Sequence, residues 1–340
     1  MIAAAARAWL VASTTALGLP LGALVLLIFH RLTGGRWGEA SKPVLAAIAS
    51  TLPLWLLLFA PLLAAVPLLM PFINAAPETL PARIVNKLGY FEPGWLVLRT
   101  LVIAAMWLVA SVLVLPGRLR VPLGPQPAAV VALVLYAGGM LVFTTDWMVA
   151  LEPEFVSTIY PILVFGAQVT GALAAATVGL RFKGLLAGRQ SGGEATKLSG
   201  DFAKLMMAAV LSWVYFAYMQ WLVIWIGNLP WEAGWYTARL ILPWPIAFWI
   251  MALGMGLLPF LAFLLRAVRQ RGDRVAAIAA LILAGYVAEG IWRVGAAFPP
   301  DAAYLVLLVV AHLVATGIMI VAVRASLART GATETTAGHA

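Results

Sequence analysis

The chain has no cysteine among its 340 residues. Disulfides, Cys-ligated iron–sulfur clusters, thiolate zinc sites and c-type haem attachment are therefore excluded. Histidine is scarce too, since only His30, His312 and His339 occur. A bis-histidine haem needs two histidines at similar depth on facing helices, but His339 lies in a polar tail and His30 ends an apolar run. We therefore expect no metal site, no redox centre and no covalently bound cofactor in this chain.

Charged residues are the second shortage, since they make up 10% of the chain while 64% is hydrophobic. A soluble domain is nearer about 25% charged and about half apolar. The composition predicts an all-α, polytopic membrane protein. The net charge of +9 could suggest a nucleic-acid partner. The basic residues follow membrane topology instead, so we expect the lipid bilayer as a partner and no nucleic acid.

Nine segments are long and apolar enough to cross a hydrocarbon core about 30 Å thick, which takes roughly 20 helical residues. They run approximately over 8–29, 44–70, 94–115, 128–147, 157–180, 203–226, 238–265, 275–296 and 302–324. A polar connection at 181–202 separates a five-helix half, 1–180, from a four-helix half, 203–328. We expect this connection to be a flexible cytoplasmic linker and the polar stretch 329–340 to be a disordered tail.

Most of the 22 lysines and arginines follow the first, third, fifth, seventh and ninth segments. The positive-inside rule therefore predicts an N-terminus outside and a C-terminus in the cytoplasm. Most of the acids lie toward the opposite, outer face. The basic residues that depart from the rule are Arg7, Arg83, Lys87, Arg99, Arg239 and Arg293.

The stretch 144–158, TTDWMVALEPEFVST, holds Asp146, Glu152 and Glu154 between two apolar segments and has no cation of its own. The proline after Glu152 biases that residue to extended backbone, so we expect a short, rigid hairpin. Three interpretations stay open. The acids are solvated caps at the membrane edge, or a route for proton uptake and release, or a surface that docks a basic partner.

Glu289 and Arg293 stand four residues apart in the eighth segment, so they share a helix face, on which Tyr286 also lies. An acid at this depth should face the bundle and be paired. The pair either locks two helices together or relays protons. His312 and Gln168 lie near the middle of their segments, where polar groups should be hydrogen-bonded across helices. Histidine also titrates near neutrality, which suits proton transfer.

The sixth segment and its exit, SWVYFAYMQWLVIWIGNLPWEAGWYTAR, are the most aromatic part of the chain. Tyr215, Tyr218 and Gln220 carry polar tips that could line a cleft for a quinone headgroup. Such residues are equally suited to anchor a helix at the membrane interface, so both interpretations stay open.

Three stretches in order resemble one known family: HRLTGGRWG at 30–38 followed by TLPLW at 51–55, DWMVALEPEFVST at 146–158, and GNLPWEAGWY at 227–236. They are similar to the second large membrane subunit of alternative complex III, the bacterial quinol:cytochrome c oxidoreductase. That subunit belongs to the polysulfide-reductase-type integral membrane subunits. The resemblance covers about residues 10–325. The matching positions are Asp146, Trp147, Pro153, Ser157, Thr158, Asn228, Pro230 and Glu232.

The resemblance implies two four-helix bundles plus a flanking helix in a bacterial inner membrane, although the family usually has ten helices. It implies partner subunits that carry iron–sulfur clusters and c-type haems, a homologous membrane subunit, and a quinone or quinol as ligand. We therefore expect a respiratory subunit that contributes to quinol oxidation or proton translocation. The candidate proton path is Asp146, Glu289, Arg293 and His312. A secondary transporter and a structural anchor for a periplasmic redox subunit are the alternatives.

Overall fold

The structure of the protein is a computed structural model, which describes residues 1–115, 123–186 and 193–337. Every regular element in these ranges is a helix. The described residues include nine helical runs that are long and apolar enough to cross a membrane. The predicted all-α, polytopic class is confirmed. The runs are Ile2–Thr33, Arg36–Ala64, Pro93–Val114, Pro125–Leu151, Tyr160–Phe182, Glu194–Gly227, Trp244–Leu264, Gly272–Gly295 and Ala302–Arg329.

Prolines divide the second run and the chain that follows it into short pieces, because a proline starts a helix readily but cannot continue one. The first four helical elements are α1 (Ile2–Thr33), α2 (Arg36–Ala49), α3 (Leu52–Phe59) and α4 (Pro61–Ala64). The next five are α5 (Val66–Leu69), η1 (Pro71–Asn74), η2 (Pro77–Thr79), α6 (Ala82–Val85) and α7 (Pro93–Val114).

The middle of the chain forms α8 (Pro125–Trp147), η3 (Val149–Leu151), α9 (Tyr160–Phe182) and α10 (Glu194–Gly227). The remainder forms α11 (Pro230–Ala238), α12 (Trp244–Met251), η4 (Ala252–Leu257), α13 (Leu258–Leu264), α14 (Arg266–Arg269), α15 (Gly272–Gly290), η5 (Ile291–Gly295) and α16 (Ala302–Ala337). Of these, η4 and η5 are π-helical and continue the axes of α12 and α15.

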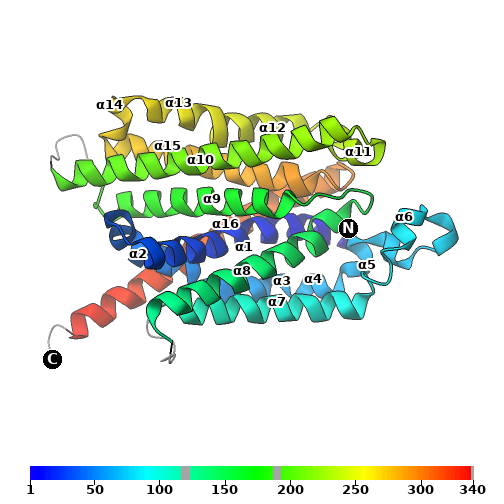
Figure 1. The fold of residues 1–340 in the computed structure, drawn as a ribbon, viewed down its shortest axis with the longest axis horizontal. Coiled ribbons are helices and arrows are strands. Elements are labelled where there is room, and N and C mark those ends of the chain that lie inside the picture. Colours follow the sequence, from blue (N-terminus) through cyan, green and yellow to red (C-terminus); the bar gives the residue numbers. More distant parts are fainter. Residues whose placement is uncertain (116–122, 187–192, 338–340) are drawn as a thin grey trace.

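The long helices pack as two four-helix groups plus one flanking helix (Figure 1). The first group consists of α1, α2–α3, α7 and α8, and the second of α9, α10, α12–α13 and α15. Helix α16 lies against α1 and α2. Helix α1 also contacts α9 and α15, so it joins the two groups and is the most enclosed span. This grouping differs from the five-and-four division along the chain, because α9 packs with α10 and α15.

Two predicted polar segments differ from the structure. Helix α10 already begins at Glu194, so the end of the expected 181–202 linker is helical, while residues 187–192 lie outside the described ranges. Helix α16 continues to Ala337, so most of the expected disordered tail 329–340 is helical too, and residues 338–340 lie outside the described ranges. In both places a long helix extends beyond its apolar part, because the hydrogen-bonded ladder propagates without needing apolar side chains.

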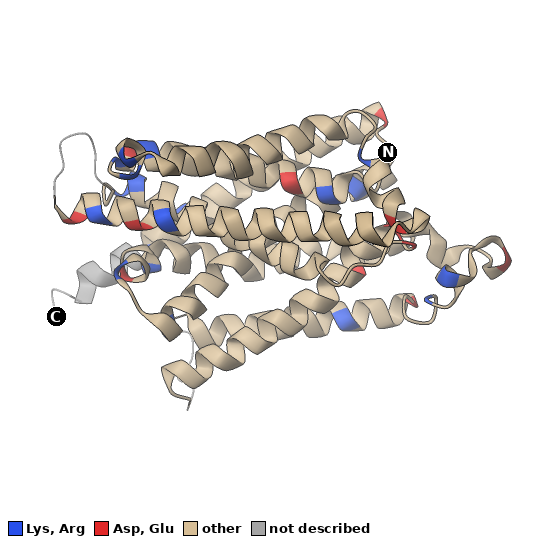
Figure 2. Ribbon diagram, turned by 45° about the horizontal axis from the view of Figure 1, so that its top comes forward, with Lys and Arg blue, Asp and Glu red and all other residues tan. Residues whose placement is uncertain are grey.

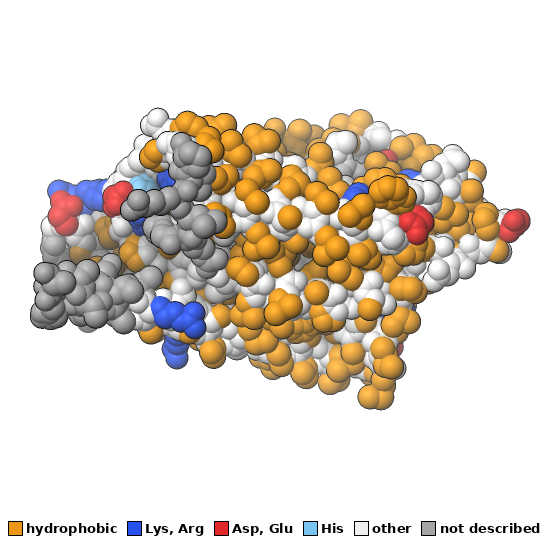
Figure 3. Space-filling model, turned by 90° about the horizontal axis from the view of Figure 1, so that it is seen from below, with side chains coloured by type: hydrophobic (Ala, Val, Ile, Leu, Met, Phe, Trp, Pro, Cys, Tyr) orange, Lys and Arg blue, Asp and Glu red, His pale blue; other side chains and the backbone are white. Residues whose placement is uncertain are grey.

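Charged residues gather at the two ends of the bundle (Figure 2), and hydrophobic side chains cover much of the face between them that Figure 3 shows. We call the end formed by 70–92, 148–159, 228–243 and 296–301 the loop end. The opposite end, with the α1–α2 turn, the start of α10 and α14, is the basic end. This banding is the surface that a bilayer requires.

Candidate functional site

Residues 148–159 connect α8 to α9 at the loop end, and arginines from elsewhere in the chain engage the acids in and beside this connection. Arg99 of α7 pairs with Asp146 at 2.9 Å, and Arg239 after α11 pairs with Glu152 at 2.8 Å. Arg83 of α6 pairs with Glu154 at 3.3 Å. Nearby, the Lys87 ammonium donates to the Pro153 carbonyl at 2.7 Å. The stretch that has no cation of its own is thus surrounded by four.

Asp146 is not the solvated cap that one interpretation expected, because its side chain is 0% exposed. Arg99 donates to both carboxylate oxygens, and its guanidinium also lies 3.9 Å from the centroid of the Tyr90 ring. Burial and the neighbouring Asp146 carboxylate raise the pKa of Tyr90 to about 12, so its hydroxyl stays protonated at physiological pH. Asp146 therefore ties α8 to α7 by a buried ion pair.

Glu289 and Arg293 form the pair that their spacing predicts. The guanidinium of Arg293 donates to both oxygens of Glu289, at 2.6 Å from Nε and 3.1 Å from Nη2, and both side chains are buried. Its Nη1 lies 3.0 Å from the Met148 sulfur, and its charge lies 5.6 Å from the centroid of the Tyr160 ring. The pair thus touches the 148–159 connection and the start of α9, and it links three elements.

Arg239 is the residue that joins this pair to the loop acids. It is fully buried, and it donates to Glu152 and to the carbonyls of Trp292 and Arg293, at 3.2 and 2.7 Å. Its guanidinium stacks on Trp235 at 3.4 Å from the ring centroid. A guanidinium with five donors suits such a junction, because it can satisfy one carboxylate and several carbonyls at once. The sequence pointed to Glu152 as one of the loop acids, but it did not predict Arg239 or Trp235 as site residues.

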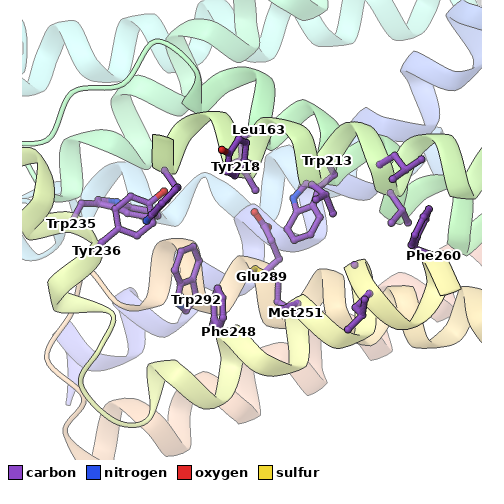
Figure 4. A pocket seen from close by; sticks show the side chains of 18 residues that line it. Leu163, Trp213, Tyr218, Trp235, Tyr236, Phe248, Met251, Phe260, Glu289 and Trp292 are labelled. Carbon is purple, nitrogen blue, oxygen red and sulfur yellow. The ribbon is translucent and has the colours of Figure 1, made fainter. Parts of the chain in front are cut away.

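A groove of about 660 Å³ lies between α10 and the α12–η4–α13 run, with α9, α15 and η5 as its other walls. Its lining is almost entirely aliphatic and aromatic, and Glu289 is the charged residue among the described residues that line it. In Figure 4 the carboxylate of Glu289 projects into the space beside Trp213. The indole Nε1 of Trp213 is buried and has no hydrogen-bond partner among the described residues. The groove therefore combines apolar walls with one hydrogen-bond acceptor, the Glu289 carboxylate, and one unpaired hydrogen-bond donor, the Trp213 indole.

The two π-helical turns flank this groove. Met251, Ala252 and Gly256, in and just before η4, line one wall, and Trp292 of η5 lines another. Helix α15 approaches η4 closely, because a Cβ at Gly285 would lie 2.5 Å from the Met255 nitrogen. π-Helical turns inside α-helices occur often at functional sites.

The predicted quinone residues do not share one cleft. Tyr218 lines the groove, whereas Tyr215 is exposed away from it. Gln220 is buried on a third side of α10, where its Oε1 accepts from the Ser157 hydroxyl at 2.9 Å. Successive helical residues are rotated by about 100°, so residues 215, 218 and 220 cannot all face the same groove. Of the three, Tyr218 alone lines this groove.

His312 lies apart from the acidic residues of the candidate path. Helix α16 packs on α1 and α2, and the His312 Nδ1 bonds the Leu308 carbonyl of its own helix at 2.8 Å. Within the described residues His312 forms no hydrogen bond or ion pair with Asp146, Glu289 or Arg293, and its Nε2 is buried without a partner, so the expected bond across helices is not formed. Gln168 does form the expected bond across helices, since it accepts from the Tyr136 hydroxyl at 2.7 Å.

Comparison with known proteins gives no match to a protein-family model and no match to a curated protein. Within the described residues, no group of three or more His, Asp and Glu side chains is arranged to hold a metal ion. The charge pattern could have revealed the missed arginine. Among the described residues, the cations that pair with Asp146, Glu152, Glu154 and Glu289 are all basic residues that depart from the positive-inside rule. When an arginine departs from the positive-inside rule, pairing with a carboxylate is a common explanation.

Proposed function

We propose that the chain is an integral membrane subunit of a respiratory quinol:cytochrome c oxidoreductase, which binds a quinol in the groove and takes up a proton at Glu289. The observation that carries the proposal is a single carboxylate in the wall of an aromatic, otherwise apolar groove. Tyr218, Trp221 and Leu257 are about half exposed along it, so an apolar molecule can reach the groove from the membrane. Localisation in a bacterial inner membrane, with the loop end outside, belongs to the same proposal.

The chemistry of the lining fits a quinol. The groove volume of about 660 Å³ lies in the range of small-molecule sites, roughly 300–1,000 Å³. Aromatic walls suit a flat ring, while Glu289 can accept a hydrogen bond and the Trp213 indole can donate one. The other lining residues offer aliphatic contact to an isoprenoid tail. No part of this fit requires a metal ligand from the chain.

Glu289 would accept one of the two protons that oxidation of a quinol releases. The second proton and the two electrons would pass to a partner subunit, for which the resemblance implies iron–sulfur clusters and c-type haems. Protonation of Glu289 would weaken its bond to Arg293. Arg239 donates to the Arg293 carbonyl and pairs with Glu152, so charged groups connect the Glu289–Arg293 pair to the loop end.

Tryptophan fluorescence of the purified chain, titrated with a short-chain ubiquinone, tests this site directly. Trp213, Trp221, Trp235 and Trp292 line the groove, and a bound quinone would quench them. We expect Glu289→Gln to weaken binding about tenfold to a hundredfold, because a hydrogen bond to a charged group contributes about 1.5–3 kcal/mol. Trp213→Phe should also weaken binding, because it removes the indole donor, and it leaves the Glu289–Arg293 ion pair intact. Glu78→Gln, at an exposed carboxylate that does not line the groove, serves as the control.

Unchanged quinone affinity in both groove variants would contradict the proposal. Purification of the tagged chain from its native membrane is the second test, and partners with iron–sulfur clusters and c-type haems are the expected result. A chain that purifies alone and supports substrate-dependent uptake in liposomes would favour the transporter instead. The anchor interpretation depends on an acidic surface that binds a basic partner. Arginines of the same chain already pair with Asp146, Glu152 and Glu154, so these acids offer less negative charge to a partner.

A further inference from the structure

A second pocket, of about 400 Å³, lies at the basic end between α10 and α14, and α14 directly follows the α13 wall of the groove. The first turns of α10 form one wall, α14 forms another, and the start of α2 closes it. Its lining contains the cations Arg36, Lys197, Lys204, Arg266 and Arg269. This concentration of positive charge is independent of the loop-end site and of the function proposed for it.

The carboxylates at this end are already engaged. Asp201 accepts from the Arg36 Nε at 3.0 Å, and Glu194 accepts from Arg36 at 3.3 Å and from Lys197 at 2.9 Å. Lys204, Arg266 and Arg269 have no carboxylate partner among the described residues. Three uncompensated cations facing one small pocket repel each other, and a bound anion relieves that repulsion.

The surroundings of the pocket favour an anion that carries acyl chains. Leu264 and Leu265, directly before Arg266, are more than half exposed. Along α10, Lys204 is followed two turns later by Leu211, about 10 Å away at the helical rise. Leu211 and Phe260 line the apolar groove between α10 and α13. Positive charge at the pocket therefore passes directly into an apolar seam that faces the membrane.

We propose that this pocket binds the phosphate of an anionic phospholipid, with Lys204, Arg266 and Arg269 as its donors and an acyl chain against the exposed Leu264 and Leu265. Basic pockets between membrane helices recognise anionic headgroups in this way. Arginine and lysine both hold phosphate through charge-assisted hydrogen bonds. A free phosphate would use the same cations but would leave Leu264 and Leu265 uncovered.

Native mass spectrometry and thermal unfolding of the delipidated full chain test the proposal. The probes are phosphatidylglycerol, phosphatidylcholine with the same acyl chains, and inorganic phosphate. We expect phosphatidylglycerol to remain bound and to raise the Tm, while the other two have little effect. The triple variant Lys204→Gln/Arg266→Gln/Arg269→Gln should bind phosphatidylglycerol about tenfold or more weakly, since it loses all three donors.

The matched control removes three basic residues of the same end that do not line the pocket: Arg181→Gln, Lys183→Gln and Lys42→Gln. It should retain the lipid, because a general attraction to the surface is reduced equally in both triple variants. The single variant Lys204→Gln, with a smaller loss, covers the case of a triple variant that fails to fold. Equal retention of both lipids, equal stabilisation by phosphate, or equal loss in the control would overturn the proposal.

Discussion

The two ends of the bundle use arginine in different ways. At the loop end, Arg239 and Arg293 are almost fully buried, and each bonds a carboxylate and holds other elements beside it. At the basic end, the Arg36 side chain is 47% exposed and its partner Glu194 is 72% exposed. Lys204, Arg266 and Arg269 have no carboxylate partner within the part of the chain that the structure describes. The same residue type thus fixes tertiary structure at one end and presents charge to the surroundings at the other.

The difference has an energetic consequence. Removing one partner of a buried pair leaves a charge without water or counterion, which typically costs about 3–5 kcal/mol. An exposed pair is screened and gains about 0–1 kcal/mol at most. A comparison of variants at the two ends therefore tests whether the burial of an ion pair, rather than the number of ion pairs, determines its contribution to the stability of this protein.

Arg293→Ala is expected to have the largest effect, a loss of about 3–5 kcal/mol, because Glu289 stays buried and uncompensated. Unfolding in mixed detergent and SDS micelles measures it. The double variant Glu289→Leu/Arg293→Met removes both charges and should recover most of the loss. If Arg293→Ala were as stable as the double variant, the pair would not be desolvated as the structure has it.

Arg239→Ala should cost about 3 kcal/mol, because Glu152 and the backbone carbonyls of Trp292 and Arg293 lose their donor. We expect α11 and the 148–159 connection to become sensitive to proteases first, since Arg239 holds them together. Limited proteolysis with mapped cleavage sites tests this. Arg83→Ala is the matched control, as the Arg83–Glu154 pair is about 40% exposed and should contribute no more than about 1 kcal/mol.

Glu92→Ala probes a smaller, pH-dependent contribution at the loop end. Glu92 caps α7 by accepting from the backbone nitrogens of Gly94 and Trp95, and these bonds lower its pKa below the ordinary 4.5. A lowered folded-state pKa means that the stabilisation is complete above pH 4.5 and is lost as the pH falls through the folded value. Thermal unfolding should show a constant gap between wild type and variant near neutral pH that closes in acid. A gap independent of pH would contradict the capping role.

Arg36→Gln is expected to have the smallest effect, with no measurable change in Tm at moderate salt, because the pair with Asp201 and Glu194 is exposed. Raising the ionic strength should leave wild type and variant equally stable. A loss comparable to that of Arg293→Ala would show that exposure does not distinguish the two ends.

Several features could be predicted from the sequence because they depend on neighbours along one helix. The nine spans follow from runs of apolar residues, and the Glu289–Arg293 pair follows from a spacing of one helical turn. The burial of Glu289 was predictable as well, since an acid within a membrane span must face the protein. Where helices extend past their apolar part, as α10 and α16 do, hydropathy alone misplaced the ends.

The tertiary structure alone decided which distant residues meet. Asp146 and Arg99 are 47 positions apart, and Glu152 and Arg239 are 87 apart, so no local spacing could pair them. The groove also depends on the tertiary structure. The rotation of α10 about its axis places Tyr218 in the groove but not Tyr215 or Gln220, and it brings Trp213 beside Glu289. Hydrophobicity fixes that a segment crosses the membrane, but side-chain packing between helices fixes how it is rotated, and the rotation determines which polar groups face one another.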